Sequence, residues 1–443
     1  MEIDIRSLET YNELAREGTE SAATALRELT GVETRVDVTD VSLLSVSDLQ
    51  YEFAGRTFAG VEVSLGAPLS GETVLAFDEA GRDAITSELV PTDDPERVEE
   101  AIAEAGNIMV NGFISGWADH LDTKVEVSPP TYVEGTGIDV LPEAMLAGKS
   151  QSERKGERGS PDATTSERDD VDGESESNGE YVFVFRSRVE AIGEDIDFRM
   201  LLFPKIESIE QLLESDGDGN PDTDATGGND GGNGISLDKL EVFTEMTERG
   251  ATKAAANVTT MTGLETAVEV NQLSFIPIAD IPAQVGDDRR VGTAVEYTGS
   301  PSGYLAILFD PASARESVDA LLPVESDGEW GERDREALEE LCNIVASGFL
   351  DGWANVLETS IKHSPPRFIA DMGSSIMSPI IADIGRTENY AFLLDSTIKT
   401  GDSDSLQCQL FALPRRDELA TALEELLVNR AGKTRADPDE LFE

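Results

Sequence analysis

The apolar positions between residues 98 and 117 recur with the period of an α-helix. At 100° per residue, four polar positions fall within about 60° of one another. They form a narrow polar stripe: Glu100, Glu104, Asn107 and Asn111. The opposite side carries apolar or small side chains: Val98, Ile102, Ala105, Met109, Phe113, Gly116 and Trp117. The pattern predicts a helix that buries one face and exposes the stripe.

The same pattern occurs again 236 residues later. The segment 104–130, EAGNIMVNGFISGWADHLDTKVEVSPP, aligns without a gap with 340–366, ELCNIVASGFLDGWANVLETSIKHSPP, and 13 of the 27 positions are identical. The second stripe consists of Glu336, Glu340, Asn343 and Ser347. A short strand is predicted after each helix, at 123–127 and 359–363, and Ser-Pro-Pro should end it because proline fixes φ and donates no hydrogen bond.

The repetition extends over most of the chain. Residues 254–270 resemble 22–38 at an offset of 232, whereas Leu413-Pro414 repeats Phe203-Pro204 at an offset of 210. The smaller offset assigns residues 148–180, in which one valine is the only sizeable apolar side chain, to the first copy alone as a disordered insert. We predict a first domain at 1–213, a flexible acidic linker at 214–235, a second domain at 236–432 and a tail at 433–443.

Periodicity also predicts the elements of the first domain. Helices are expected at 8–30, 79–88 and 206–213, and strands at 36–38, 41–46, 58–65, 72–77, 131–142, 181–189 and 197–203. A faint half-repeat relates Thr34–Val38 to Thr123–Val127. The sequence therefore predicts an α+β fold in which each domain is a pseudo-twofold duplication of a helix plus antiparallel strands. The linker should span roughly 25 Å, so the domains would move independently unless they dock.

The composition indicates the cellular environment of the protein and excludes some classes of partner. The chain carries 34 Lys and Arg against 89 Asp and Glu, a net charge of −55. Self-repulsion of this size is screened when the Debye length falls to about 3 Å at 1 M salt, which indicates adaptation to a salt-rich cytoplasm. With no basic patch, binding to nucleic acid or to anionic membranes is disfavoured. Two cysteines, no long apolar run and no signal-like N-terminus lead us to expect a soluble cytoplasmic protein.

Several residues have plainer interpretations than catalysis. His120 and His363 are the only histidines and stand at non-equivalent positions, so we expect neither Ser-His-Asp chemistry nor a histidine metal site. Trp117, Trp353 and Cys342 are expected in the core. Residues 216–224 alternate Asp with small residues as calcium loops do, but Pro and Gly stand at 221 and 227 where an EF-hand needs Gly and Glu. The stripes themselves could be solvated helix faces.

At the helix-strand-proline unit the sequence resembles the CheC family of chemotaxis phosphatases. Their signature is Asp or Ser, three residues, Glu, two residues, Asn, twenty-two residues, Pro. That spacing is filled twice: by Glu100, Glu104, Asn107 and Pro130, and by Glu336, Glu340, Asn343 and Pro366. Glu replaces Asp or Ser at the first position of both copies.

The resemblance implies hydrolysis of the acyl phosphate of a CheY-like response regulator, which brings its own Mg²⁺, so that this chain needs no cofactor or metal. Asn107 and Asn343 would orient the water, and Glu104 and Glu340 would pair with a lysine of the regulator. The other stripe residues, Glu100, Glu336, Asn111 and Ser347, would contact the partner, and Pro130 and Pro366 would be structural.

Members of the family often carry one site per half-unit, but the first halves here look inactive. The asparagine position near Glu13 falls on 16–18, and the one near Glu245 falls near Glu248. Glu9-Thr-Tyr-Asn12 imitates the motif without the proline. The alternative function is a non-catalytic adaptor of the chemotaxis or motility apparatus that binds the deamidase CheD or the regulator.

Overall fold

A computed structural model describes residues 2–31, 33–45, 48–49, 53, 55–90, 94–120, 123–142, 181–191, 197–205, 208, 234–322, 330–400 and 407–425. The expected insert at 148–180 and the tail at 433–443 lie outside these ranges, as do the helix expected at 206–213, apart from Ser208, and nearly all of the linker. The exceptions in the linker are Gly234 and Ile235, which belong to strand β8 (Gly234–Ser236) and pair with β1 (Glu2–Asp4). The end of the predicted linker is therefore part of the fold.

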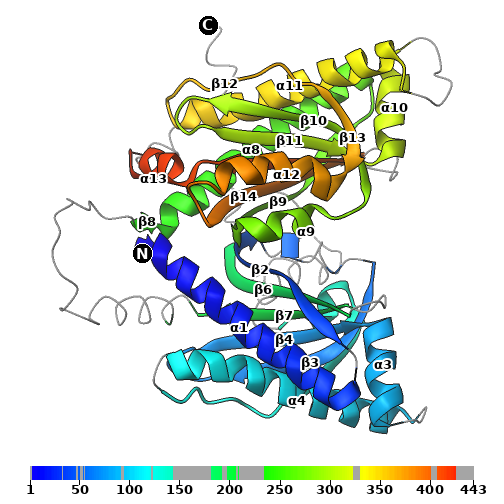
Figure 1. Ribbon diagram of the computed structural model, residues 1–443, viewed down its shortest axis with the longest axis vertical. Coiled ribbons are helices and arrows are strands. Elements are labelled where there is room, and N and C mark those ends of the chain that lie inside the picture. Colours follow the sequence, from blue (N-terminus) through cyan, green and yellow to red (C-terminus); the bar gives the residue numbers. More distant parts are fainter. Residues whose placement is uncertain are drawn as a thin grey trace, which may run out of the picture.

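The core of the molecule is one sheet of 13 strands that runs through both halves of the chain (Figure 1). The first half contributes β2 (Thr34–Ser45), β3 (Thr57–Leu65), β4 (Gly71–Asp78), β5 (Thr131–Thr136), β6 (Tyr181–Ala191) and β7 (Asp197–Pro204). The second half contributes β9 (Thr266–Pro277), β10 (Arg289–Thr298), β11 (Gly303–Phe309), β12 (Lys362–His363), β13 (Phe368–Met372), β14 (Tyr390–Thr400) and β15 (Gln407–Pro414). The order is β12-β10-β11-β15-β14-β9-β2-β6-β7-β4-β3-β5, with β13 beside β10. Every described pair is antiparallel, as the α+β prediction requires.

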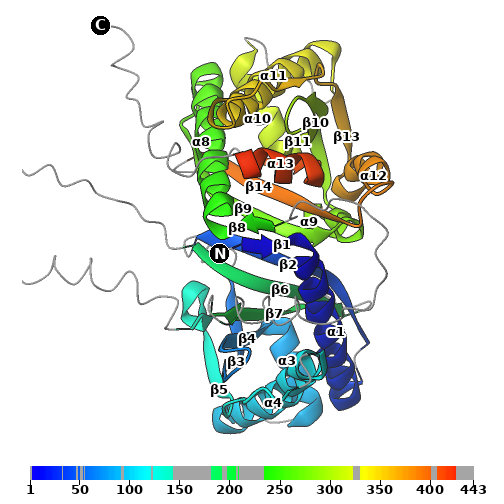
Figure 2. The same ribbon diagram turned by 90° about the vertical axis from the view of Figure 1, so that its left-hand side faces the viewer.

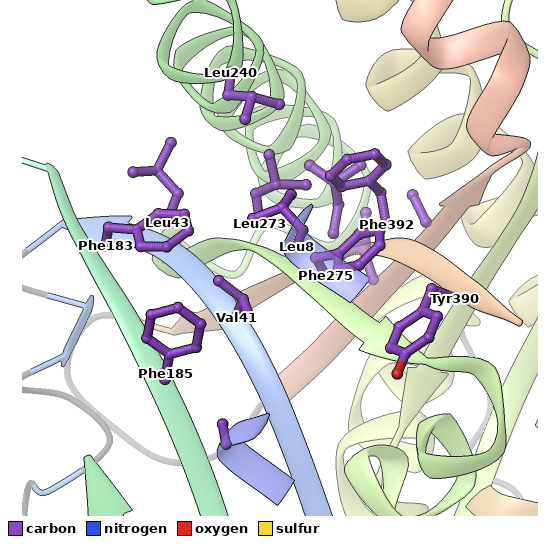
Figure 3. Packing of buried hydrophobic residues seen from close by; sticks show 14 of the residues in the cluster. Leu8, Val41, Leu43, Phe183, Phe185, Leu240, Leu273, Phe275, Tyr390 and Phe392 are labelled. Carbon is purple, nitrogen blue, oxygen red and sulfur yellow. The ribbon is translucent and has the colours of Figure 1, made fainter. Parts of the chain in front are cut away.

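The halves meet where β2 pairs with β9, at Val41↔Phe275, Ser42↔Ser274 and Leu43↔Leu273. Ser42 and Ser274 are separated by 232 residues, the same offset that relates the two copies, so a pseudo-twofold axis passes between them. Apolar side chains from both halves interdigitate at this seam (Figure 3). The two domains therefore dock through shared backbone hydrogen bonds and a common core.

Four long helices pack into that common core: α1 (Ile5–Thr30), α4 (Pro95–His120), α8 (Leu237–Thr262) and α11 (Glu332–Val356). They associate in pairs, α1 with α4 and α8 with α11, and each pair crosses at small residues. A Cβ added to Gly18 would stand 2.6 Å from the carbonyl oxygen of Phe113, and one added to Gly250 would stand 2.9 Å from the carbonyl oxygen of Phe349. Since these glycines occupy corresponding places in the two halves, the crossing is duplicated with the sequence.

The remaining helices are short: α3 (Glu79–Leu89), α9 (Ile281–Val285), α10 (Pro311–Leu321), α12 (Gly373–Ile384) and α13 (Arg416–Glu425). Two smaller apolar clusters complete the packing. In the second half, α9 and α12 cover residues of β9, β11, β14 and β15. In the first half, Leu49, Phe53 and the 3-10 turn η1 (Gly137–Val140) cover residues of β3, β4, β6 and β7.

Several predicted strands have different lengths in the structure. The strand expected at 123–127 is reduced to a single bridge between Val127 and Leu65, and the one at 359–363 to the two residues of β12. The stretch 131–142 divides into β5 and η1, while 36–38 and 41–46 merge into β2. In the described parts of the chain, no helix is long and apolar enough to cross a membrane.

Candidate functional site

Helix α4 displays the first polar stripe as predicted. The helix begins at Pro95, whose missing N–H costs nothing at a first helical position, and the carbonyl of Asp94 accepts hydrogen bonds from the N–H groups of Arg97 and Val98. Ile102, Ala105, Met109, Phe113 and Trp117 are buried in the core beneath it. On the other side Glu100, Glu104 and Asn111 are exposed, and Asn107 is half-buried.

The two asparagines of this stripe are bonded to each other. The side-chain amide of Asn111 donates to the backbone oxygen of Asn107 at 2.7 Å and to its side-chain oxygen at 3.0 Å. The second bond occupies the carboxamide oxygen of Asn107 and directs its NH₂ group away from Asn111. Asn111 therefore holds the side chain of Asn107 in one orientation.

Helix α11 displays the second stripe in the same way. Glu336 and Glu340 are exposed, and Asn343 and Ser347 are half-buried. Leu338, Leu341, Val345, Phe349 and Trp353 are fully buried on the other side. The first turn is fixed by Asp334, which accepts from the N–H of Gly331 at 3.2 Å and pairs with Arg315 at 2.9 Å.

At the second site the last residue of the stripe, Ser347, has a different hydrogen-bond partner from Asn111. The hydroxyl of Ser347 lies 3.0 Å from Nε2 of His363, whose Nδ1 lies 2.9 Å from the carbonyl oxygen of Ser364. A carbonyl can only accept, so Nδ1 carries the proton of the neutral ring and Ser347 donates to Nε2. This pair is not a Ser-His-Asp triad, because the second ring nitrogen of His363 meets a backbone carbonyl oxygen and not an aspartate. The pair could not be inferred from the first copy, where Val127 stands at the position of His363.

The Ser-Pro-Pro segments are anchored identically at both sites. The N–H of Ser128 donates to the carbonyl of Ser64 at 2.9 Å, and the Ser128 hydroxyl accepts from the N–H of Ser64 at 2.9 Å. Ser364 makes the same two bonds with Glu296, at 2.8 and 3.2 Å. Pro130 and Pro366, both half-buried, follow these anchors. The residue pattern indicated the Ser-Pro-Pro segments, but it did not predict that their serines anchor them to Ser64 and Glu296.

The first-half helices do not offer comparable sites. Asn12 is fully buried, and its amide donates to the carbonyls of Thr39 at 3.2 Å and Phe275 at 3.4 Å. It is therefore a seam residue, in agreement with its interpretation as a mimic of the motif. Glu13 is exposed, but Arg16, one turn further on, pairs with Asp280 of the second half at 2.6 Å. The side chain of Glu245 lies outside the described part of the chain.

The residues with plainer interpretations are in the core. Trp117, Trp353 and Cys342 are fully buried. Burial raises the pKa of the Cys342 thiol to about 12, so this thiol is not a nucleophile at neutral pH. In the described ranges, no group of three or more His, Cys, Asp or Glu side chains could hold a metal ion.

The stripes thus combine a carboxylate and a carboxamide on a rigid, half-exposed helix face. A carboxamide both donates and accepts without adding charge, so it can hold a water molecule beside an anionic group. A carboxylate one turn away can bind a cationic side chain of a partner. Each of the two stripes therefore offers a carboxylate and a carboxamide that are accessible to a partner macromolecule.

Comparison with known proteins identifies the class of protein. The family model "Chemotaxis phosphatase CheX" matches residues 291–385, and the model "CheC-like family" matches 98–134, which includes Glu104, Asn107 and Pro130. The chain is 32% identical over 182 residues to the putative CheY-P phosphatase CheC1 of Halobacterium salinarum, covering 92% of that protein and 41% of this one. It is 23% identical over 195 residues to the CheY-P phosphatase CheC of Bacillus subtilis, again covering 92% of the relative and 42% of this chain. The chain belongs to the CheC-like family.

Solved structures similar to part of the chain include FliY of Thermotoga maritima, with a TM-score of 0.34, 16% identity, and coverage of 48% of this chain and 97% of FliY. Another is CheX of Vibrio vulnificus, with a TM-score of 0.27, 16% identity, and coverage of 38% of this chain and 95% of CheX.

Proposed function

We propose that this protein dephosphorylates a phosphorylated CheY-like response regulator, with Asn107 and Asn343 as the water-orienting residues. The observation that carries the proposal is the repetition of one arrangement: a Glu and an Asn one turn apart, half-exposed to exposed, above a buried tryptophan and beside an anchored Ser-Pro-Pro. Family membership and the names of the two relatives support a phosphatase.

The proposed reaction depends more on the position of the attacking water than on a reactive side chain of this protein. The phosphoaspartate brings its own leaving group and the regulator brings Mg²⁺, so the helper needs to fix a water in line with the bond that breaks. Asn107, oriented by Asn111, is suited to this task. Glu104 and Glu340 would repel a phosphoryl group directly, and their use is to dock a lysine of the regulator. A tenfold rate gain needs about 1.4 kcal/mol, which one placed hydrogen bond can supply.

The decisive experiment is phosphate release from a phosphorylated CheY-like regulator in molar KCl, with and without this chain. Asn107→Ala combined with Asn343→Ala should slow release by at least tenfold, and each single change should leave about half the rate. The matched control is Asp119→Ala combined with Asn355→Ala, because these exposed residues occupy the same position on the two helices, away from the stripes. A double asparagine variant as fast as the wild type would refute the proposal.

The partner and the setting follow from the same proposal. The regulator is the proposed direct partner, CheD is the proposed second partner, and the proposed site of action is the cytoplasm. A wild-type chain that binds the regulator in a pull-down without releasing phosphate would instead establish the adaptor function.

A further inference from the structure

A polar cavity of about 270 Å³ lies on the seam between the two halves. It is lined from both sides of the β2–β9 junction, by residues of β2, β6 and β7 in the first half and of β9, β14 and β15 in the second. The two smaller apolar clusters are centred on the strands to either side of it. The seam cavity is distinct from the stripes on α4 and α11, and the proposed phosphatase chemistry does not use it.

The two walls of the seam cavity are equivalent positions of the repeat that have acquired opposite chemistry. Asp40 and Gln272 are related by the 232-residue offset, and they pair across the sheet with Arg186 and Asp395, respectively. Arg186 and Asp395 are therefore the same position in the two copies. A symmetric pocket would place like groups on its two walls. Here the first-half wall carries a guanidinium where the second-half wall carries a carboxyl group.

The two copies also differ at an equivalent position one strand further from the β2–β9 junction. Arg199 of β7 and Gln409 of β15 both line the cavity and are related by the 210-residue offset. Arg188 also lies on the first-half wall, next to Arg186 on β6. Three arginines thus gather on one wall, in a chain with only 34 basic residues among 443. The opposite wall offers the amides of Gln272, Gln407 and Gln409 and the carboxyl of Asp395.

The second-half wall holds acceptors that the described residues leave unsatisfied. Asp395 is 8% exposed, and its Oδ1 atom has no hydrogen-bond partner among the described residues; the same holds for Oε1 of Gln409. Buried acceptors are almost always satisfied in folded proteins. Two that line one cavity therefore indicate a donor that enters from outside.

The first-half arginines are held in place by neighbouring groups. Arg186 donates to Asp40 at 3.0 Å and to Gln272 at 3.0 Å, so it links the two halves. Arg188 pairs with Asp37 and donates to the carbonyl of Ala283 at 3.2 Å. A guanidinium has five N–H donors. Those of Arg186 are largely used by Asp40, Gln272 and Ser274, whereas the bonds of Arg188 come from Nε and Nη2 and leave its Nη1 group to meet a ligand.

We propose that the seam cavity binds a small zwitterion of the α-amino acid type, with its carboxylate on the arginine wall and its ammonium at Asp395 Oδ1 and Gln409 Oε1. A simple anion would leave both acceptors, Asp395 Oδ1 and Gln409 Oε1, unmet. A simple cation would face three guanidinium groups. A zwitterion satisfies both walls, and the cavity volume is close to the lower end of small-ligand sites, about 300 Å³.

The proposal is tested with the full chain by isothermal titration calorimetry at pH 8 in molar KCl, with each standard L-α-amino acid as probe. Propionate and L-alaninamide, which present only the anionic or only the cationic end of alanine, and inorganic phosphate are the comparison ligands. We expect at least one amino acid to bind with 1:1 stoichiometry. The three comparison ligands should bind at least tenfold more weakly than that amino acid.

Variants locate the site. Asp395→Asn removes the negative charge that the ammonium would meet, and Gln409→Leu removes an acceptor. Each should weaken binding at least tenfold, and Arg188→Gln should do the same from the opposite wall. Two acceptor variants are used so that misfolding of one, checked by circular dichroism, does not decide the result. Arg333→Gln on the exposed face of α11 and Asn107→Ala at the first stripe should bind as the wild type does. The proposal is overturned if no amino acid binds, if phosphate or propionate binds as well, or if binding survives in the correctly folded acceptor variants.

Discussion

The hydroxyl oxygens of Ser42 and Ser274 lie 2.9 Å apart at the centre of the molecule, where each is the counterpart of the other in the duplicated chain. Ser42 also bonds to Asp40, and Ser274 lies 3.4 Å from Arg186. The pseudo-twofold axis therefore passes through a buried polar network, and around that network the two copies have become different. Covalent fusion allows such asymmetry, because the two halves no longer need to satisfy an identical partner.

The first prediction concerns the ion pair of this network. Arg186→Met should lower the free energy of unfolding by about 3–5 kcal/mol, because it leaves the buried carboxylate of Asp40 uncompensated. Adding Asp40→Leu should recover most of the loss, since replacing a whole buried pair by apolar groups is often neutral. Denaturant titration in molar KCl measures both. Arg97→Met, which breaks an exposed pair with Asp94, is the control and should change stability by less than about 1 kcal/mol.

The second prediction is a pH dependence that originates at Asp395. Burial raises the pKa of this carboxyl from 3.8 to about 7, and Arg186 offsets only part of that shift. Between pH 4 and pH 7 the folded state therefore retains a proton that the unfolded chain has lost. The contribution of Asp395 to stability falls as pH rises through this window and is constant above it.

Asp395→Asn removes this dependence. The stability of the variant relative to the wild type should therefore increase from pH 5 to pH 7, by at most about 1.4 kcal/mol per pH unit, and then level off. Asp351→Asn, at an exposed position on α11, should show no such trend. A constant difference between Asp395→Asn and wild type across this range would contradict the raised pKa.

The third prediction tests the helix crossing. Gly18→Ala should destabilise the first half by about 1–3 kcal/mol, because the new methyl group would meet the backbone of Phe113 at 2.6 Å. Gly112→Ala on the partner helix is the matched control. Its nearest neighbour would be at 3.5 Å, so it should be neutral or should gain up to about 1 kcal/mol from helix propensity. Thermal unfolding of the two variants should separate them clearly.

The fourth prediction distinguishes the two sites. With the second site silenced by Asn343→Ala, Asn111→Ala should slow phosphate release about threefold to tenfold, because Asn107 loses the bond that orients its carboxamide. With the first site silenced by Asn107→Ala, Ser347→Ala should have a smaller effect, because Ser347 bonds to His363. Equal effects would show that the Asn107–Asn111 bond does not orient Asn107 for the proposed reaction.

The sequence predicted what depends on local periodicity. The stripe on α4 and the buried face below it, from Ile102 to Trp117, follow from a 3.6-residue repeat that the structure preserves. The duplication and the antiparallel strands could also be predicted from the sequence. The family resemblance supplied the roles of the stripe residues, which remain to be tested by mutation.

The features that periodicity did not predict depend on contacts between residues far apart in the chain. Nothing local distinguishes Asn12 from an exposed site residue, yet the seam buries it against Thr39 and Phe275. The contact of Ser347 with His363 and the convergence of Arg186 with Gln272 likewise require strands brought together from distant segments. The strand expected at 123–127 is reduced to the bridge between Val127 and Leu65, a pairing that also depends on a segment far away in the chain.

The continuity of the sheet also sets how many partners one chain can serve. Helices α4 and α11 lie at opposite ends of the molecule (Figures 1 and 2), and nine strand-to-strand steps separate β3 from β10. At about 4.8 Å per step this is roughly 43 Å along the sheet, whereas a small globular domain measures about 30 Å across. A single regulator therefore cannot reach both asparagines at once, and the saturated complex should contain two regulators for each chain.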